Sequence, residues 1–127
     1  MKLTTLTTKS VSQAVEDLKQ AVTNNNFSVL HIHDLHKTLN SKGIDFKNEC
    51  QVLEICNPTH ASKVLAEDMS MNMVLPCRVS VYEDNGKTYI GMVSPVALME
   101  ASGPSEALRK IATDVETTTK KIIKEAV

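Results

Sequence analysis

Aromatic side chains are scarce in this sequence. It has no tryptophan, two tyrosines and two phenylalanines among 127 residues. A surface that stacks nucleic-acid bases needs several aromatic rings, and a groove that follows a phosphate backbone needs clustered cations. The formal net charge is -1, and both signs of charge are mixed along the chain. We therefore do not expect nucleic acid as a partner.

Long apolar runs are also missing. No stretch approaches the roughly 20 apolar residues that a membrane-spanning helix needs. The N-terminus begins Met1-Lys2-Leu3 and continues into threonines, without the apolar centre of an export signal. We expect no membrane association and a cytoplasmic location.

Cysteines are few and odd in number. The three are Cys50, Cys56 and Cys77. Without an export signal, an odd set of cysteines predicts reduced thiols rather than a disulfide framework. A chain of 127 residues that is 42% hydrophobic can still bury a core without disulfides or metals, so we expect a single domain over residues 1–127.

The apolar spacing predicts alternating strands and helices. Ser10 and Gln13 form a capping-box pattern, and Asp84-Asn85-Gly86 is a strong hairpin-turn signal. The order β-α-β-(α)-β-α-β-β-α predicts an α+β fold, with two layers and a mainly antiparallel sheet that packs its helices on one face. We expect strands over 2–8, 27–33, 47–56, 77–83 and 87–93, helices after Ser10, over 34–42, from Pro58, over 96–101 and from Pro104, and an apolar loop over 69–75.

Alternation along the strands predicts two different sheet faces. The mixed polar and apolar face suits half-coverage by a second subunit, so we expect a homodimer through this face or through an edge of the sheet. The predicted core face carries Leu30, Ile32, Leu53, Ile55, Val79, Val81, Ile90 and Met92, and the opposite face carries Val29, His31, His33, Val52, Glu54 and Tyr82 or Tyr89.

Two short clusters at the ends of predicted strands are the best candidates for a site, and they cover residues 54–58 and 75–78. Each combines a cysteine with a proline, and a thiol at a strand end is open to solvent and ligands. Cys56 and Cys77 are the candidate catalytic residues. Glu54 is an acid within an apolar strand, and Arg78 is its candidate partner. The candidate ligand-binding residues are Glu54, Cys56, Asn57, Pro76, Cys77 and Arg78.

Histidines form a second constellation. His31 and His33 alternate along a strand and project from the same face, where Glu54 or Cys50 could complete a metal shell. The spacing matches no closed metal site, so we assign no metal and keep His31 and His33 only as candidates. His60 follows Cys56 closely enough in sequence to lower the pKa of that thiol.

The same clusters carry a family resemblance. The chain is similar to the domain of unknown function 302 family, most closely over about residues 32–99. The resemblance implies a small α+β domain, commonly dimeric and found in bacteria and archaea, with no assigned activity. The matching segments are Glu54-Ile55-Cys56-Asn57-Pro58, Leu75-Pro76-Cys77-Arg78-Val79, Val81-Tyr82-Glu83-Asp84-Asn85-Gly86 and Ser94-Pro95.

Three functions remain open from the residues. The first is a cytosolic, dimeric accessory domain that binds a small ligand, a sulfur species or a metal near Cys56, Asn57, Pro76 and Cys77. The second is a thiol-dependent redox enzyme that uses Cys56 or Cys77 as its nucleophile. The third is a purely structural or interaction module. The sequence has no glycine-rich phosphate loop, nucleophile elbow or paired-carboxylate motif, and it identifies no cofactor.

Overall fold

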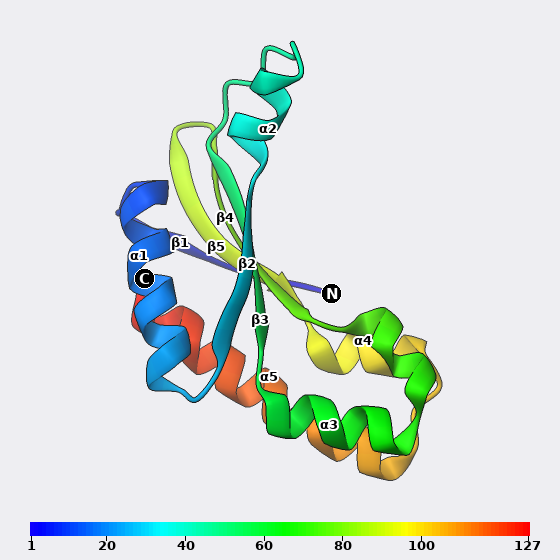
Figure 1. The fold of residues 1–127 in the computed structure, drawn as a ribbon. Coiled ribbons are helices and arrows are strands. Elements are labelled where there is room, and N and C mark those ends of the chain that lie inside the picture. Colours follow the sequence, from blue (N-terminus) through cyan, green and yellow to red (C-terminus); the bar gives the residue numbers. More distant parts are fainter.

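The computed structural model describes residues 1–127 as two layers, a twisted antiparallel sheet and helices packed against it (Figure 1). The strand order is β1-β5-β4-β3-β2. The predicted α+β class and element order are confirmed. The elements are β1 (Lys2–Thr7), α1 (Val11–Asn24), β2 (Ser28–Asp34), α2 (Leu35–Ser41), β3 (Cys50–Cys56), α3 (Pro58–Glu67), the 3-10 helix η1 (Met69–Val74), β4 (Cys77–Asp84), β5 (Lys87–Val93), α4 (Pro95–Ala101) and α5 (Glu106–Ala126).

Side-chain caps explain where several helices begin. The Ser10 hydroxyl accepts a hydrogen bond from the Gln13 backbone N–H at 3.2 Å, so the predicted start of α1 is confirmed. The expected helix start at Pro104 is wrong by two residues. Ser105 is the N-cap of α5, which begins at Glu106, because the serine side chain can accept from a first-turn N–H.

The core lies between the sheet and its two longest helices, α1 and α5. Apolar residues at helical spacing on these helices meet the alternate residues of the strands. None of the helices combines the length and the apolar character required to cross a bilayer. The buried sheet residues of the core are Leu53, Ile55, Val79, Val81, Ile90 and Met92, as predicted.

One strand breaks the predicted alternation. A β-bulge in β2 lies between Val29, which pairs with Ile55, and His31, which pairs with Glu54. The extra residue, Leu30, is 58% exposed, whereas Val29 packs against the core. The predicted positions of Leu30 in the core and Val29 on the outer face are therefore wrong, because a bulge inserts one residue and reverses the parity of those before it.

The hairpin turn is as expected. Asn85 and Gly86 both have positive φ angles, of 51° and 76°, which is the backbone of the tight two-residue turn that asparagine and glycine favour. The predicted loop after α3 is instead the 3-10 helix η1, whose Met71 is buried. A buried apolar side chain holds this segment against its neighbours.

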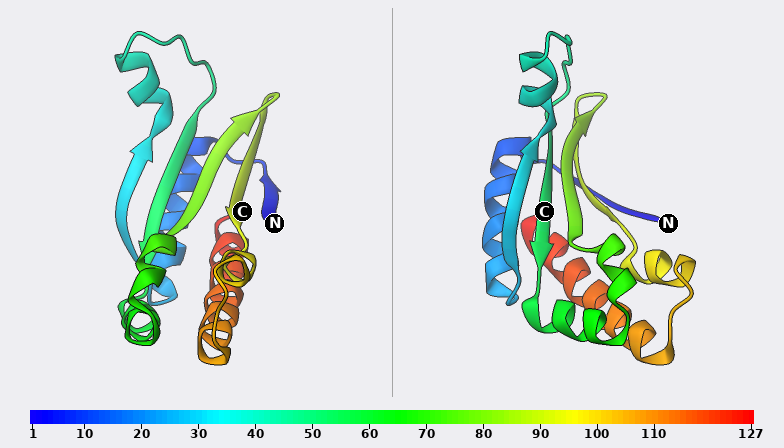
Figure 2. Two further views of the ribbon diagram at one scale, coloured as in Figure 1. Left: turned by 90° about the vertical axis from the view of Figure 1, so that its right-hand side faces the viewer. Right: turned by 45° about the vertical axis from the view of Figure 1, so that its right-hand side comes forward.

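The two strands of the hairpin separate halfway along. β4 and β5 pair from Asp84–Lys87 only as far as Ser80–Gly91. Beyond that point β4 stays paired with β3, up to the Ile55–Cys77 pair, and β5 stays paired with β1, up to the Lys2–Val93 pair. The sheet therefore divides into two parts at the end where α3 and α4 attach (Figure 2).

Candidate functional site

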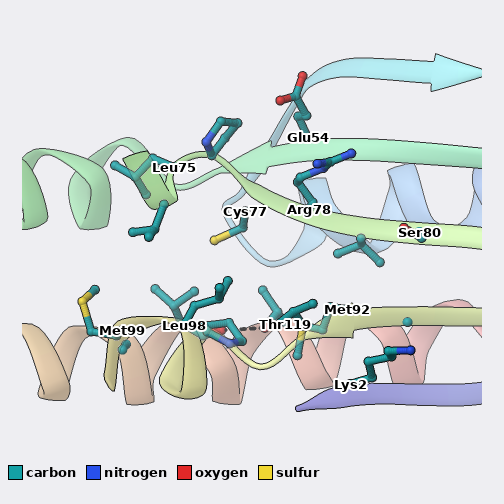
Figure 3. A pocket seen from close by; sticks show the side chains of 18 of the residues that line it. Lys2, Glu54, Leu75, Cys77, Arg78, Ser80, Met92, Leu98, Met99 and Thr119 are labelled. Carbon is teal, nitrogen blue, oxygen red and sulfur yellow. Dashed lines mark hydrogen bonds between the residues drawn. The ribbon is translucent and has the colours of Figure 1, made fainter. Parts of the chain in front are cut away.

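A cavity of about 630 Å³ fills the division of the sheet. Figure 3 shows Leu75 and Cys77 on the β4 side of this gap and Met92, Leu98 and Met99 on the opposite side. The Cys77 sulfur points into the gap. We call this cavity the slot. It runs from the outer face of the sheet towards α5.

The deep wall of the slot is apolar. It is formed by α5 residues that include Ile111, Ala112 and Val115, with Val74 of η1 contributing from the other side. Thr119 is the polar exception on α5, but its hydroxyl donates to the Val115 carbonyl of its own helix at 2.9 Å. The deep slot thus offers a ligand no free polar side chain of α5.

The mouth of the slot carries two exposed cations. Lys2 lies on the β1 side and Arg78 on the β4 side (Figure 3). Neither forms a salt bridge within the chain. The expected ion pair of Glu54 with Arg78 is absent although the two residues are register partners, because Glu54 Oε1 lies 2.8 Å from His33 Nε2 instead.

The slot collects four of the predicted ligand-binding residues, which are Glu54, Pro76, Cys77 and Arg78. Cys56 and Asn57 do not line it. They border a separate cavity of about 30 Å³, which is also lined by Pro76 and Cys77. Asn57 has a structural role, since its side chain accepts from the His60 backbone N–H at 3.1 Å and caps α3.

All three cysteines are free and half-buried. Burial, together with the nearby Cys56, raises the pKa of the Cys77 thiol to about 11. Burial also raises the pKa of Cys50 and of Cys56. The expectation that His60 lowers the pKa of Cys56 is therefore wrong, because desolvation of the thiolate is what governs this thiol.

The histidines of β2 lie on one face, as predicted. The rings of His31 and His33 are 4.4 Å apart between centroids, at an interplanar angle of 72°. Glu54 approaches His33, but the structure contains no group of three or more histidine, cysteine, aspartate or glutamate residues arranged to hold a metal ion. His36 lies elsewhere, 3.1 Å from the Asn48 carbonyl oxygen.

Sequence reasoning missed several residues of the slot. Lys2 and the α5 residues belong to segments far from the two cysteine clusters. Gly91 also lines the slot, and a glycine inside a strand is itself a signal of close backbone approach. A Cβ atom at Gly91 would lie 3.0 Å from the Leu3 carbonyl oxygen. This glycine therefore lets β1 lie close against β5 beside the slot.

A family model described as domain of unknown function DUF302 matches residues 3–126. The chain belongs to this DUF302 family. The resemblance inferred from the cysteine and proline clusters is confirmed, and the match extends over nearly the whole chain. The DUF302 assignment does not specify an activity, so the slot is the starting point for function.

A solved structure agrees with this DUF302 fold. The crystal structure of an uncharacterized conserved DUF302 protein from Bacillus stearothermophilus superimposes with a TM-score of 0.94 at 31% sequence identity. The match covers 99% of this chain and 98% of that chain. A search of curated proteins gave no match.

Proposed function

We propose that this protein is a small-molecule-binding domain whose ligand occupies the slot between β4 and β5. The observation that carries the proposal is the division of the hairpin beyond Ser80 and Gly91, which leaves a space of about 630 Å³. Small-molecule sites in proteins typically enclose about 300–1,000 Å³ and have mostly apolar walls with a few polar groups. The slot has both properties.

The size of the slot also argues for a function. Protein interiors are packed about as densely as organic crystals and tolerate few voids larger than a water molecule. The slot interrupts hairpin pairing that Val79 and Met92 would otherwise continue. A gap of this kind weakens the sheet, so occupancy by a ligand explains its presence better than packing alone.

The thiol chemistry supports binding over catalysis. A nucleophilic cysteine needs its thiolate at neutral pH, and the pKa of Cys77 is about 11. A redox enzyme that uses Cys77 or Cys56 therefore has less support than a binding domain. A neutral Cys77 thiol instead contributes a polarisable surface to the slot, which suits an apolar ligand or a reduced sulfur compound.

The proposal includes a homodimer in the cytoplasm. Three unpaired thiols are consistent with a reducing compartment. The outer face of the sheet carries Tyr82 and Tyr89, stacked with ring centroids 5.5 Å apart, beside the 52% exposed Leu6. We call these three residues the tyrosine patch. It lies at the hairpin end of the sheet and shares only Tyr82 with the slot, so a second copy can cover it and leave Lys2 and Arg78 at the mouth of the slot exposed.

Binding of the neutral apolar dye Nile red tests the proposed function. The chain has no tryptophan, so a single introduced tryptophan reports on its own site. Leu98 on α4 lines the slot and is 42% exposed, so Leu98→Trp should fold and transfer energy to bound dye. We expect saturable dye fluorescence and a marked loss of tryptophan emission in Leu98→Trp.

The matched control is Leu35→Trp, on α2 and 37% exposed, which does not line the slot. Its emission should respond much less to the dye. Ala112→Phe should fill the deep slot and abolish binding, and circular dichroism would establish that this variant is folded. Absence of saturable dye binding to the wild type, or equal responses of the two tryptophan variants, would overturn the proposed function.

A further inference from the structure

We propose that the ligand of the slot is an amphiphile with a single carboxylate, whose alkyl chain enters the slot while Lys2 and Arg78 hold the carboxylate at its mouth. This inference rests on the proposed function and names its ligand class. It follows from the separation of apolar and charged groups along the slot.

The interior of the slot suits an alkyl chain rather than a polar molecule. Apolar side chains of α4, α5 and η1 form its walls, and the Thr119 hydroxyl is already bonded to its own helix. No buried side-chain nitrogen or oxygen atom in the structure lacks a hydrogen-bond partner. A polar group carried deep into the slot would lose its water and find no free side-chain partner there, which is unfavourable.

The register of the strands brings the two cations to the same end of the slot. Lys2 pairs with Val93, and continued pairing of the hairpin would have set Val93 opposite Arg78. Lys2 and Arg78 therefore flank the opening from its two sides. Both side chains are exposed and unpaired, so each is free to meet an anionic group. Arginine in particular matches a planar carboxylate through two parallel hydrogen bonds.

The charge balance favours a monoanion. Glu54 also lines the slot, next to Arg78 in the sheet register. Two cations and one carboxylate leave an excess of one positive charge at the mouth when His33 is neutral. A singly charged carboxylate neutralises this excess, whereas a dianionic phosphate would add repulsion from Glu54. The outer part of the mouth also holds hydroxyl groups, at Thr4, Ser80 and Tyr82.

Competition with Nile red tests the headgroup. The competitors are decanoic acid, decan-1-ol, decylamine and decyl phosphate, each below its critical micelle concentration. We expect decanoate to displace the dye at a concentration at least about tenfold lower than decanol, with decylamine the weakest. Added salt should weaken the binding of decanoate more than the binding of decanol, because salt screens the exposed cations.

Lys2→Met and Arg78→Met, combined in one variant, remove both charges and keep long side chains. We expect this variant to lose the preference for decanoate over decanol, a ratio measured within the variant and therefore independent of any change in its affinity for Nile red. The control combines Lys37→Met on α2 with Lys87→Met at the hairpin end of β5, which removes two positive charges at positions that do not line the slot and should keep the preference for decanoate.

The outcomes separate this inference from the proposed function. Suppose that the wild type binds Nile red and that decanoate and decanol displace the dye equally well. This result would overturn the carboxylate assignment and leave the slot as a binding site. Tighter competition by decyl phosphate than by decanoate would also overturn it, in favour of a phosphate. Failure of the dye itself to bind would remove the proposed function and this inference together.

Discussion

Cys77 is the residue at which the structure bears most directly on chemistry. Its sulfur points into the slot. Neighbouring side chains exclude water from the thiol, and the nearby Cys56 disfavours a negative charge on it. These effects act in the same direction and keep the thiol protonated at neutral pH. A cysteine in this state is an apolar wall residue, whereas a catalytic cysteine is usually surrounded by groups that stabilise its thiolate.

Alkylation of Cys77 should therefore be slow. In a Cys50→Ser, Cys56→Ser variant, we expect iodoacetamide to react much more slowly than with the same protein unfolded in urea. The rate should keep rising well above pH 9, because only the thiolate reacts and burial, the main cause of the raised pKa of Cys77, remains in this variant. Mass spectrometry of the labelled fraction measures this rate. A midpoint at or below the ordinary thiol pKa of about 8.5 would support the redox alternative instead.

At the scale of elements, one carboxylate joins α4 to α5. Ser94 is 1% exposed and caps α4, and its hydroxyl donates to Glu116 Oε1 of α5. The Val96 backbone N–H donates to the same oxygen at 3.3 Å. The hydrogen bond from Ser94 is the main reason that the pKa of Glu116 lies below its ordinary value. This contact holds α4 along one side of the slot.

Glu116→Ala should lower the free energy of unfolding at neutral pH by about 1–2 kcal/mol, because the Ser94 hydroxyl and the Val96 N–H lose their acceptor. Urea denaturation measures the change. Asp114→Ala, exposed on the same helix and without an ion pair, should leave stability nearly unchanged. A loss in Asp114→Ala equal to that in Glu116→Ala would show that the effect belongs to the helix and not to this contact.

The same contact predicts the direction of a pH effect. The pKa of Glu116 is lower in the folded chain than in the unfolded chain, so the stabilisation is complete above the unfolded value of about 4.3. It is lost as the pH falls through the lower, folded value. The difference in stability between the wild type and Glu116→Ala should therefore shrink at acidic pH. A difference that stays constant down to strongly acidic pH would contradict this assignment.

At the scale of the whole molecule, the outer sheet face has two unlike halves. The tyrosine patch at the hairpin end is apolar, and the mouth of the slot is charged. The two helices that form the core with the sheet, α1 and α5, pack on its other face (Figure 1). Tyr82 belongs to both halves, but a protein that buried its tyrosine patch against a second copy would remove exposed apolar surface and still leave Lys2 and Arg78 exposed at the mouth of the slot.

This arrangement predicts the oligomeric state. Light scattering should give a mass twice that of the 13.9 kDa chain. Leu6→Lys and Tyr89→Lys, each made as a separate variant, should convert the dimer to the monomer. In each variant the twofold contact would bury one new lysine from either subunit, and the two like charges would repel each other. Ser12→Lys, at an exposed position on α1, should leave the dimer intact. A wild-type monomer, or a dimer indifferent to both patch variants, would rule out this contact.

Much of the fold could be predicted because its signals are local. Ser10 caps the first helix through its own side chain, and Asn85-Gly86 makes the hairpin turn because both residues accept positive φ angles. The bulge at Leu30 could not be predicted in this way. The bulge depends on how β2 pairs with β3. A strand with a bulge has no sequence pattern that distinguishes it from a regular strand.

The candidate site could be predicted only in part, because only some of its residues have local signals in the sequence. Pro76, Cys77 and Arg78 could be found because a proline and a cysteine at the start of a strand are visible in the sequence. Lys2 and Ala112 could not, since each comes from a distant segment and has no distinguishing neighbours. Their role follows only from the strands and helices that meet around the slot.

The sequence by itself determined the class of fold, the order of its elements, the hairpin and the membership of the DUF302 family, because capping, periodicity and turn preferences act over a few residues. Only the tertiary structure decided that β4 and β5 separate beyond Ser80 and Gly91 and that an apolar slot opens between them. That opening depends on where α3, α4 and α5 pack, which is a balance of contacts between segments far apart in the chain.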